Sequence, residues 1–203
     1  MKNSFKIVML FLALFCVSFD SSRKETIQVV IDVAHGGEDS GATFLEWKEK
    51  DIVNQIASKI KSQNQNANVE IDFTRNQDDQ LSLEQRLEKI RKIKPDFVIC
   101  LHVNNNNDFS KNGFGVFVPE NTLTSKKSMT LATNFVESFS NKTNLVFNEI
   151  KPANYFILRK SEYPTILLEL GFLSNENNRN LITNEDGQNK IAAEILMFIE
   201  NSK

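Results

Sequence analysis

Three long apolar runs constrain the fold of this chain more than any other feature of its sequence. They cover residues 27–35, 96–103 and 163–172 and read IQVVIDVAH, DFVICLHV and YPTILLELGF. Runs that are apolar at almost every position and rich in β-branched residues are typical of strands buried on both faces. Segments with apolar residues three or four apart lie between them and predict amphipathic helices. This alternation predicts an α/β fold with a mainly parallel β-sheet flanked by helices.

The other predicted elements complete the alternation. Residues 49–63 place isoleucines at every fourth position, which predicts a helix with one buried face. Residues 81–93 predict a second helix, with Ser82 as its N-cap and Pro95 just beyond its end. Further strands are predicted over 68–75 and 113–120, and further helices over 123–142 and 187–203.

Length and composition limit both the number of domains and the kind of partner. A chain of 203 residues has room for one ordinary domain, which we place over residues 25–203. Its 24 Lys and Arg against 26 Asp and Glu give a formal net charge of −2. A protein that binds the phosphate backbone of nucleic acid needs a clear basic excess, so we expect no nucleic-acid partner. Two cysteines are too few for a disulfide framework.

The first 22 residues have the pattern of an export segment. Two lysines precede a short apolar run over residues 7–15, and polar residues follow from Asp20. The run is shorter than the roughly 20 apolar residues that a transmembrane helix needs. We therefore expect residues 1–22 to be a signal peptide or N-terminal export segment, so that the protein acts in the periplasm or cell envelope of a bacterium. The alternative is a lipid attached at Cys16, which would anchor the protein to the membrane.

Each of the three apolar runs carries a residue that can take part in metal chemistry. The first run ends at His35, the second reaches His102, and the third contains Glu169; the chain has no other histidine. Sites in open α/β sheets form outside the carboxyl ends of the strands, so we expect these three residues to meet at one edge of the sheet. A carboxylate in an apolar strand is costly unless it is paired, metal-bound or neutralised. A buried ion pair between Glu169 and Arg159 is the alternative.

Two histidines do not complete a catalytic zinc site, which uses three protein ligands and keeps a fourth position open. A carboxylate at the same edge is the expected third ligand. The candidates that follow the first histidine are Glu38, Asp39, Glu46, Glu49 and Asp51. Spacing does not choose among them, and an acid at the start of a helix is also favoured by the helix dipole alone.

Five segments of the chain follow one another in an order that is typical of one enzyme family. They read IDVAHGGEDSGA (31–42), EKD (49–51), TRNQDDQLSLEQR (74–86), CLHVN (100–104) and YPTILLELGFLSN (163–175). Together they resemble the zinc-dependent N-acetylmuramoyl-L-alanine amidases that act on peptidoglycan, the amidase type 3 family. The resemblance runs from about residue 27 to the C-terminus, and its last segment is the most specific.

The resemblance implies a cofactor, a catalytic residue and a substrate. One zinc ion would be held by His35, Glu49 and His102, and Glu169 would be the general base for zinc-activated water. The substrate would be the amide bond between N-acetylmuramic acid and L-alanine in peptidoglycan. Glu46 is the alternative third ligand, because the segment TFLEWK just before Glu49 lacks the usual glycines and is one residue shorter.

Three other polar residues, Asn104, Arg75 and Arg86, have expected roles outside the zinc site. Asn104 is a candidate for substrate binding and, equally, for a loop cap. We expect Arg75 and Arg86 to be structural partners of Asp78 or Asp79.

Two other readings of the whole chain remain open at this level. One is a zinc hydrolase acting on another peptide or amide bond, and the other is a catalytically inactive cell-wall-binding module. Lys50 and Asp51 are expected to be ordinary residues of a first helical turn. Besides peptidoglycan, the expected partners are an activator or wall-targeting protein, with membrane contact only through the N-terminal segment or a lipid at Cys16.

Overall fold

The computed structural model describes residues 26–140 and 142–202. The predicted export segment, and Cys16 within it, lie outside these residues. No helix in the described part of the chain is both long and apolar enough to cross a membrane.

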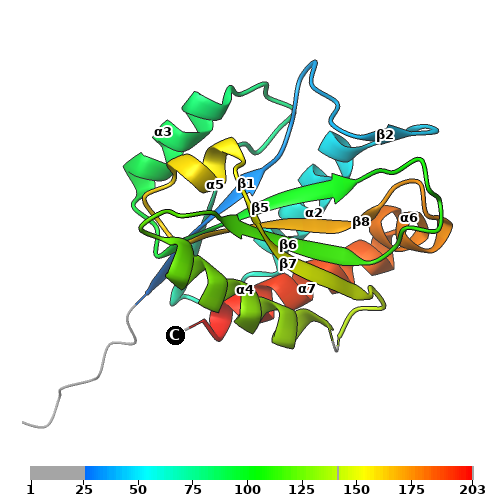
Figure 1. Cartoon of the computed structure of the whole chain (residues 1–203). Helices are drawn as coiled ribbons and strands as arrows, with labels where there is room; N and C mark the ends of the chain where they lie inside the picture. The colour runs from blue at the N-terminus through cyan, green and yellow to red at the C-terminus, as the bar shows by residue number, and fades with distance from the viewer. Residues whose placement is uncertain (1–25, 141, 203) are drawn as a thin grey trace, which may run out of the picture.

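A six-stranded sheet forms the centre of the molecule (Figure 1). Its strands are β1 (Ile27–Val33), β4 (Val69–Phe73), β5 (Phe97–Asn104), β6 (Phe114–Pro119), β7 (Phe147–Ala153) and β8 (Thr165–Phe172), in the spatial order β4-β1-β5-β8-β6-β7. Strands β6 and β8 run antiparallel, and the other neighbouring pairs run parallel. The predicted fold class, an α/β fold with a mainly parallel sheet, is therefore confirmed.

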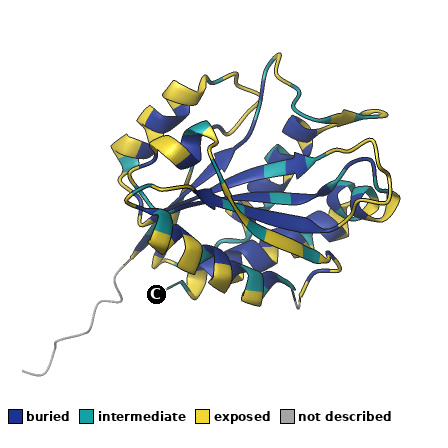
Figure 2. Cartoon of the chain, in the orientation of Figure 1, coloured by how far each residue is buried: buried dark blue, intermediate teal, exposed yellow. Residues whose placement is uncertain are grey.

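Helices cover both faces of this sheet, but they cover them unequally (Figure 1). The larger core packs one face against α2 (Glu49–Gln63), α4 (Ser125–Ser140), α6 (Glu176–Thr183) and α7 (Glu185–Glu200). The smaller core packs the other face against α3 (Leu83–Ile93) and the five-residue helix α5 (Phe156–Lys160). Alternate positions of β1 divide accordingly, because Val29 joins the larger core and Val30 the smaller one. Strands β1, β5, β6 and β8 are mostly buried, while the outer helical faces are exposed (Figure 2).

The boundaries of the two most regular helices agree with the sequence prediction. Helix α2 spans Glu49–Gln63, as its isoleucine spacing predicts. Helix α3 begins after Ser82, which forms a capping box with Gln85. Its C-cap, Lys94, has a φ of 57°, and the following Pro95 cannot continue a helix.

Four short or peripheral elements were not predicted. They are β7, α5, α6 and the hairpin formed by β2 (Thr43–Phe44) and β3 (Trp47–Lys48). Strand β7 lies at an edge of the sheet, and only every third of its side chains is partly buried, so the sequence shows no strand-like alternation there. The hairpin and α5 are too short for periodicity to reveal them.

Candidate active site

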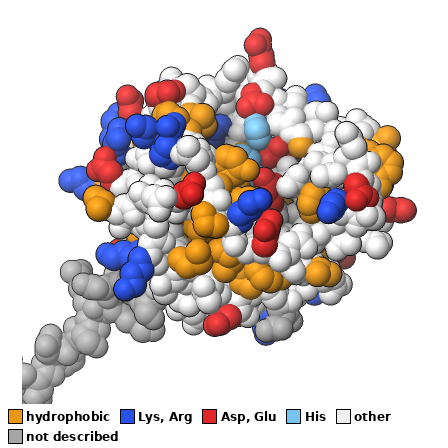
Figure 3. All heavy atoms as spheres, in the orientation of Figure 1, with side chains coloured by type: hydrophobic (Ala, Val, Ile, Leu, Met, Phe, Trp, Pro, Cys, Tyr) orange, Lys and Arg blue, Asp and Glu red, His pale blue; other side chains and the backbone are white. Residues whose placement is uncertain are grey.

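All five predicted site residues line one cavity of about 750 Å³. His102 and Glu169 are register partners on the adjacent strands β5 and β8, close to their carboxyl ends. His35 follows the end of β1 by two residues, and Glu49 is the first residue of α2. The cavity opens on the face of the sheet that α3 and α5 cover only in part. Figure 3 shows histidine side chains in a hollow of this surface, with acidic and hydrophobic side chains around them.

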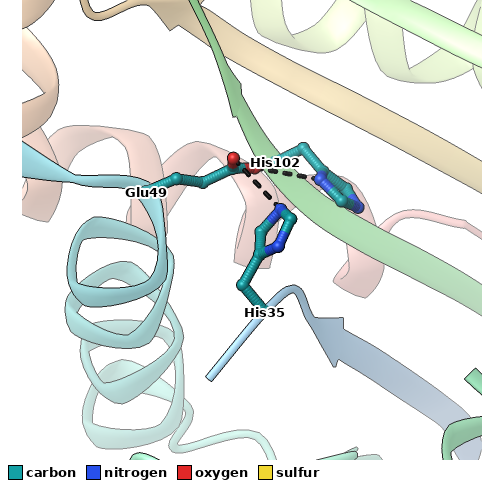
Figure 4. A group of neighbouring side chains, drawn as sticks. All are labelled: His35, Glu49 and His102. Atoms are coloured by element: carbon teal, nitrogen blue, oxygen red, sulfur yellow. Dashed lines mark hydrogen bonds and ion pairs between the residues drawn. The ribbon is translucent and has the colours of Figure 1, made fainter. Parts of the chain in front are cut away.

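His35, Glu49 and His102 form a compact cluster (Figure 4). One donor atom from each side chain lies within 4.8 Å of the other two. The Glu49 carboxylate extends between the two imidazoles: its Oε2 is 3.1 Å from His35 Nε2, and its Oε1 is 2.9 Å from His102 Nδ1. The two rings are nearly perpendicular, with centroids 5.3 Å apart. This arrangement of nitrogen and oxygen donors is suited to a divalent cation.

Backbone hydrogen bonds hold Glu49 in this position. The Ala42 N–H donates to Glu49 Oε2 at 2.8 Å, and the Val103 N–H donates to Oε1 at 2.9 Å. The carboxylate is buried, with 4% of the residue exposed. Glu46, the alternative third ligand, is exposed in the turn of the β2–β3 hairpin. The structure therefore brings Glu49, and not Glu46, to the histidines.

Asp39, another candidate for the third ligand, instead contacts the far side of an imidazole. Its Oδ2 lies 2.8 Å from His35 Nδ1, and its Oδ1 accepts a hydrogen bond from the Gly41 N–H. A carboxylate in this place fixes the orientation of the ring and leaves Nε2 directed at Glu49. The remaining candidates, Glu38 and Asp51, are exposed.

Two buried arginines hold the backbone that carries His35. This residue has a φ of 58°, which is uncommon outside glycine and explains why the predicted strand over 27–35 ends at Val33. Arg86 donates to the carbonyl oxygen of His35, and Arg75 donates to that of Ala34. Arg86 also forms a buried ion pair with Asp32 at 2.9 Å.

Neither Arg75 nor Arg86 forms the expected ion pair with Asp78 or Asp79, although the charge of Asp78 acts on Arg75. Lys50 pairs with Asp78 in place of the arginines: its Nζ lies 2.6 Å from Asp78 Oδ2 and also donates a hydrogen bond to the Gly37 carbonyl oxygen. Lys50 is buried and is therefore more than an ordinary first-turn residue. The two arginines are instead needed for carbonyl groups that the left-handed turn leaves without secondary-structure partners.

The cluster favours positive charge. Burial alone would lower the pKa of His35, but hydrogen bonds and charge from Glu49 and Asp39 outweigh it and raise that pKa to about 9. Burial would raise the pKa of Glu49, but hydrogen bonds from His102 and His35 hold it well below its usual range. Glu49 and Asp39 therefore stabilise positive charge on His35 in the metal-free protein, and they would stabilise a bound cation in the same way.

Glu169 differs from the other acids that line the cavity, Asp32, Asp39 and Glu49, because it forms no ion pair with a described residue. Its Oε2 is buried and has no hydrogen-bond partner among the described residues. Burial raises the pKa of Glu169 to about 7, with His102 opposing the rise and Glu49 adding to it. The alternative ion pair with Arg159 is wrong, since no ion pair joins these two described residues, and the Arg159 guanidinium instead lies 5.8 Å from the ring centroid of Phe156.

Asn104 lines the same cavity. Its Oδ1 accepts a hydrogen bond from the Asn105 N–H at 2.8 Å, so the side chain caps the loop that follows β5. Its role in substrate binding stays a prediction.

A second wall of the cavity was not predicted from the sequence. That wall is apolar and comes from the residues around the starts of α3 and α5: Leu81, Leu83, Tyr155, Phe156 and Ile157. The wall depends on a five-residue helix, which leaves no periodic signal.

We predict that the His35–Glu49–His102 cluster binds a divalent cation such as zinc, and that Gly41→Ala weakens this binding by about 10- to 100-fold, the usual effect of disturbing residues around metal ligands. Gly41 has a φ of 64°, and an added Cβ would lie 2.5 Å from both Glu49 Oε2 and His35 Cδ2. Zinc titration with a competing chelator measures the effect. Gly115→Ala is the matched control, because its added Cβ meets nothing closer than 3.7 Å. Equal zinc affinity in the two variants would contradict the prediction.

The fold and the side chains around this cavity define an α/β domain with an imidazole–carboxylate centre suited to hydrolysis. Comparison with known proteins identifies it further. Residues 29–201 match the family described as N-acetylmuramoyl-L-alanine amidase. The chain therefore belongs to the N-acetylmuramoyl-L-alanine amidase family, and the resemblance seen in the sequence is confirmed.

Individual relatives agree with this assignment. The N-acetylmuramoyl-L-alanine amidase AmiC of Escherichia coli is 25% identical over 89% of this chain, which spans only 54% of AmiC. The catalytic domain of the amidase CwlV of Bacillus (Paenibacillus) polymyxa is 29% identical, with a TM-score of 0.80 over 87% of this chain and 98% of the domain. The CwlD amidase of Clostridioides difficile, solved in complex with the GerS lipoprotein, is 26% identical, with a TM-score of 0.70 over 85% of this chain and 95% of CwlD.

Proposed function

We propose that this chain hydrolyses the amide bond between N-acetylmuramic acid and L-alanine in peptidoglycan. One zinc ion would be bound by His35, Glu49 and His102, with Glu169 as the general base. The observation that carries the proposal is the position of Glu169, whose buried Oε2 has no hydrogen-bond partner among the described residues, in the same cavity as a cluster of two imidazoles and a carboxylate. Family membership supports the choice of bond.

The donor set fits zinc. Imidazole nitrogens and carboxylate oxygens are ligands that zinc takes in proteins, and one such atom from each of the three side chains lies within 4.8 Å of the other two. Three protein ligands leave one position for water or substrate, which is the arrangement of catalytic zinc. A bound zinc ion supplies a Lewis acid, which polarises a carbonyl group and lowers the pKa of water.

Glu169 accounts for the proton transfers. Its free Oε2 accepts a proton from the attacking water and then delivers that proton to the leaving nitrogen of L-alanine. A base whose pKa lies near the working pH is suited to both steps, and burial brings the pKa of Glu169 to about 7. No nucleophilic serine or cysteine is required. Asn104 would hydrogen-bond the substrate from the end of β5.

The remaining proposals concern location and partners. We propose that residues 1–22 export the protein, that residues 25–203 form the amidase domain, and that it acts in the periplasm or cell envelope. Mass spectrometry of the envelope fraction should find a chain that lacks these residues or carries a lipid at Cys16. An activator or wall-targeting protein is a further proposed partner, supported by the lipoprotein bound to the similar CwlD amidase.

Digestion of purified peptidoglycan tests the proposed reaction. We expect zinc-loaded protein to release peptides that begin with L-alanine, which end-group labelling and mass spectrometry identify. Release of a different new amine would indicate a zinc hydrolase of another bond. Binding to peptidoglycan without zinc or product would indicate an inactive wall-binding module.

A further inference from the structure

The two walls of the catalytic cavity have different chemistry. One wall carries the histidines and carboxylates, while the other carries large apolar side chains that are still partly exposed. Tyr155 and Leu83 are each 48% exposed there, although most large apolar residues in the described part of the chain are buried. Half-exposed apolar side chains inside a cavity are typical of ligand contact.

Tyr155 presents an aromatic ring in this wall that is exposed to the cavity and also packed against a neighbouring ring. Its ring packs against Phe117 of β6, with centroids 5.6 Å apart and planes inclined by 58°. Phe117 is opposite Leu167 in the sheet, and Gly115, two residues earlier, is opposite Glu169. Opposite residues of an antiparallel pair point to the same face. The two rings therefore lie on the same side of the sheet as Glu169.

Gly115 has no side chain, which leaves space between this aromatic pair and Glu169. A Cβ at Gly115 would meet the Phe117 ring at 3.7 Å, so the ring reaches toward the position beside Glu169 without filling it. The cavity is thus continuous from Glu169 to the Tyr155 ring, which both line it. A substrate whose scissile amide lies at Glu169 would therefore place the group on one side of that amide against this wall.

The proposed substrate has a different chemical group on each side of its scissile amide, and one of these groups is better suited to contact an aromatic ring. One side of the scissile amide carries a pyranose ring, and the other carries a peptide. A pyranose presents C–H groups on its face, and their partial positive charge complements the negative face of an aromatic ring. We propose that Tyr155 stacks against the sugar ring of the N-acetylmuramoyl group. This inference rests on the proposed function and adds a specificity-determining residue to it.

Two soluble substrates with the same scissile bond test the contact. One is N-acetylmuramoyl-L-alanyl-D-isoglutamine, and the other is D-lactoyl-L-alanyl-D-isoglutamine, which lacks the pyranose. Tyr155→Ala should raise KM for the muramoyl peptide by about 3- to 10-fold, the usual worth of one aromatic contact, with kcat little changed. Its KM for the lactoyl peptide should remain that of the wild type.

Matched variants separate stacking from a general structural effect. Tyr155→Phe keeps the ring and should behave as the wild type on both substrates, whereas Tyr155→Leu keeps apolar bulk and should behave as Tyr155→Ala. Phe109→Ala removes an aromatic residue that is 61% exposed in a different pocket, and it should change neither KM. Zinc content and melting temperature are measured on each preparation.

Two results would overturn the inference in distinguishable ways. An equal change of KM on both substrates in Tyr155→Ala, or no change on the muramoyl peptide, removes Tyr155 from sugar recognition and leaves the proposed reaction standing. Hydrolysis of neither substrate by the zinc-loaded wild type contradicts the proposed function itself, and the inference with it.

Discussion

Glu169→Gln is expected to lower kcat for peptidoglycan hydrolysis by about 10²–10⁴-fold, the usual contribution of a positioned general base. The substitution preserves the shape of the side chain and removes its ability to accept a proton. Zinc content should stay at the wild-type level, because Glu169 is not among the three clustered donor residues. Release of L-alanine-terminated peptides and bound zinc are measured on the same preparation.

The same variant should be more stable than the wild type at alkaline pH. Folding raises the pKa of Glu169 from 4.5 to about 7, so the folded state binds this proton more tightly than the unfolded state. The contribution of Glu169 to stability is therefore full below pH 4.5 and is lost as the pH rises through 7. In metal-free protein, the melting-temperature difference between Glu169→Gln and wild type should grow over this range and level off above it.

A structural role for Glu169 predicts the opposite pattern. If the carboxylate held the fold together, Glu169→Gln would be less stable, and activity would fall only as folded protein is lost. A stable, zinc-loaded and fully active Glu169→Gln would remove this residue from the mechanism.

His35→Ala and His102→Ala should each abolish tight zinc binding and reduce hydrolysis to background. Each variant removes one of three donor side chains, and a catalytic zinc site needs all three. Zinc is measured by elemental analysis after dialysis against a weak chelator. Folding is checked by circular dichroism, because the zinc-free variants must remain folded for the comparison to be valid.

Glu49→Ala and Glu46→Ala form a matched pair for the third ligand. Both remove a glutamate near the start of α2, but Glu49 lies between the histidines, whereas Glu46 is exposed in the hairpin turn. Zinc should be lost in the first variant and retained in the second. Retention in both, or loss in Glu46→Ala alone, would refute the assignment of Glu49.

The fold was predictable where the sequence is strongly periodic or continuously apolar. Helix α2 and strands β5 and β8 follow directly from their patterns, and together with the end of β1 they position the metal cluster. The antiparallel pairing of β6 with β8 was not predictable, because the direction of pairing depends on distant segments and leaves no local signal.

The surroundings of the site were less predictable than its central residues. The ion pair of Arg86 with Asp32 joins residues 54 positions apart, and nearer acids such as Asp78 were the more obvious partners from sequence. The choice between Glu49 and Glu46 depended on family resemblance, since spacing allows either. The apolar wall with Tyr155 depends on how a short helix packs, which no pattern of five residues encodes.

Zinc reconstitution of the wild-type protein tests the central claim most directly. The protein is stripped with a chelator, zinc is added back in steps, and L-alanine-terminated product is measured at each step. We expect no activity without metal and a linear rise in activity that stops at one zinc per chain. Full activity in the stripped protein, or one bound zinc without release of L-alanine-terminated peptides, would contradict the claim that His35, Glu49 and His102 hold the zinc of a peptidoglycan amidase.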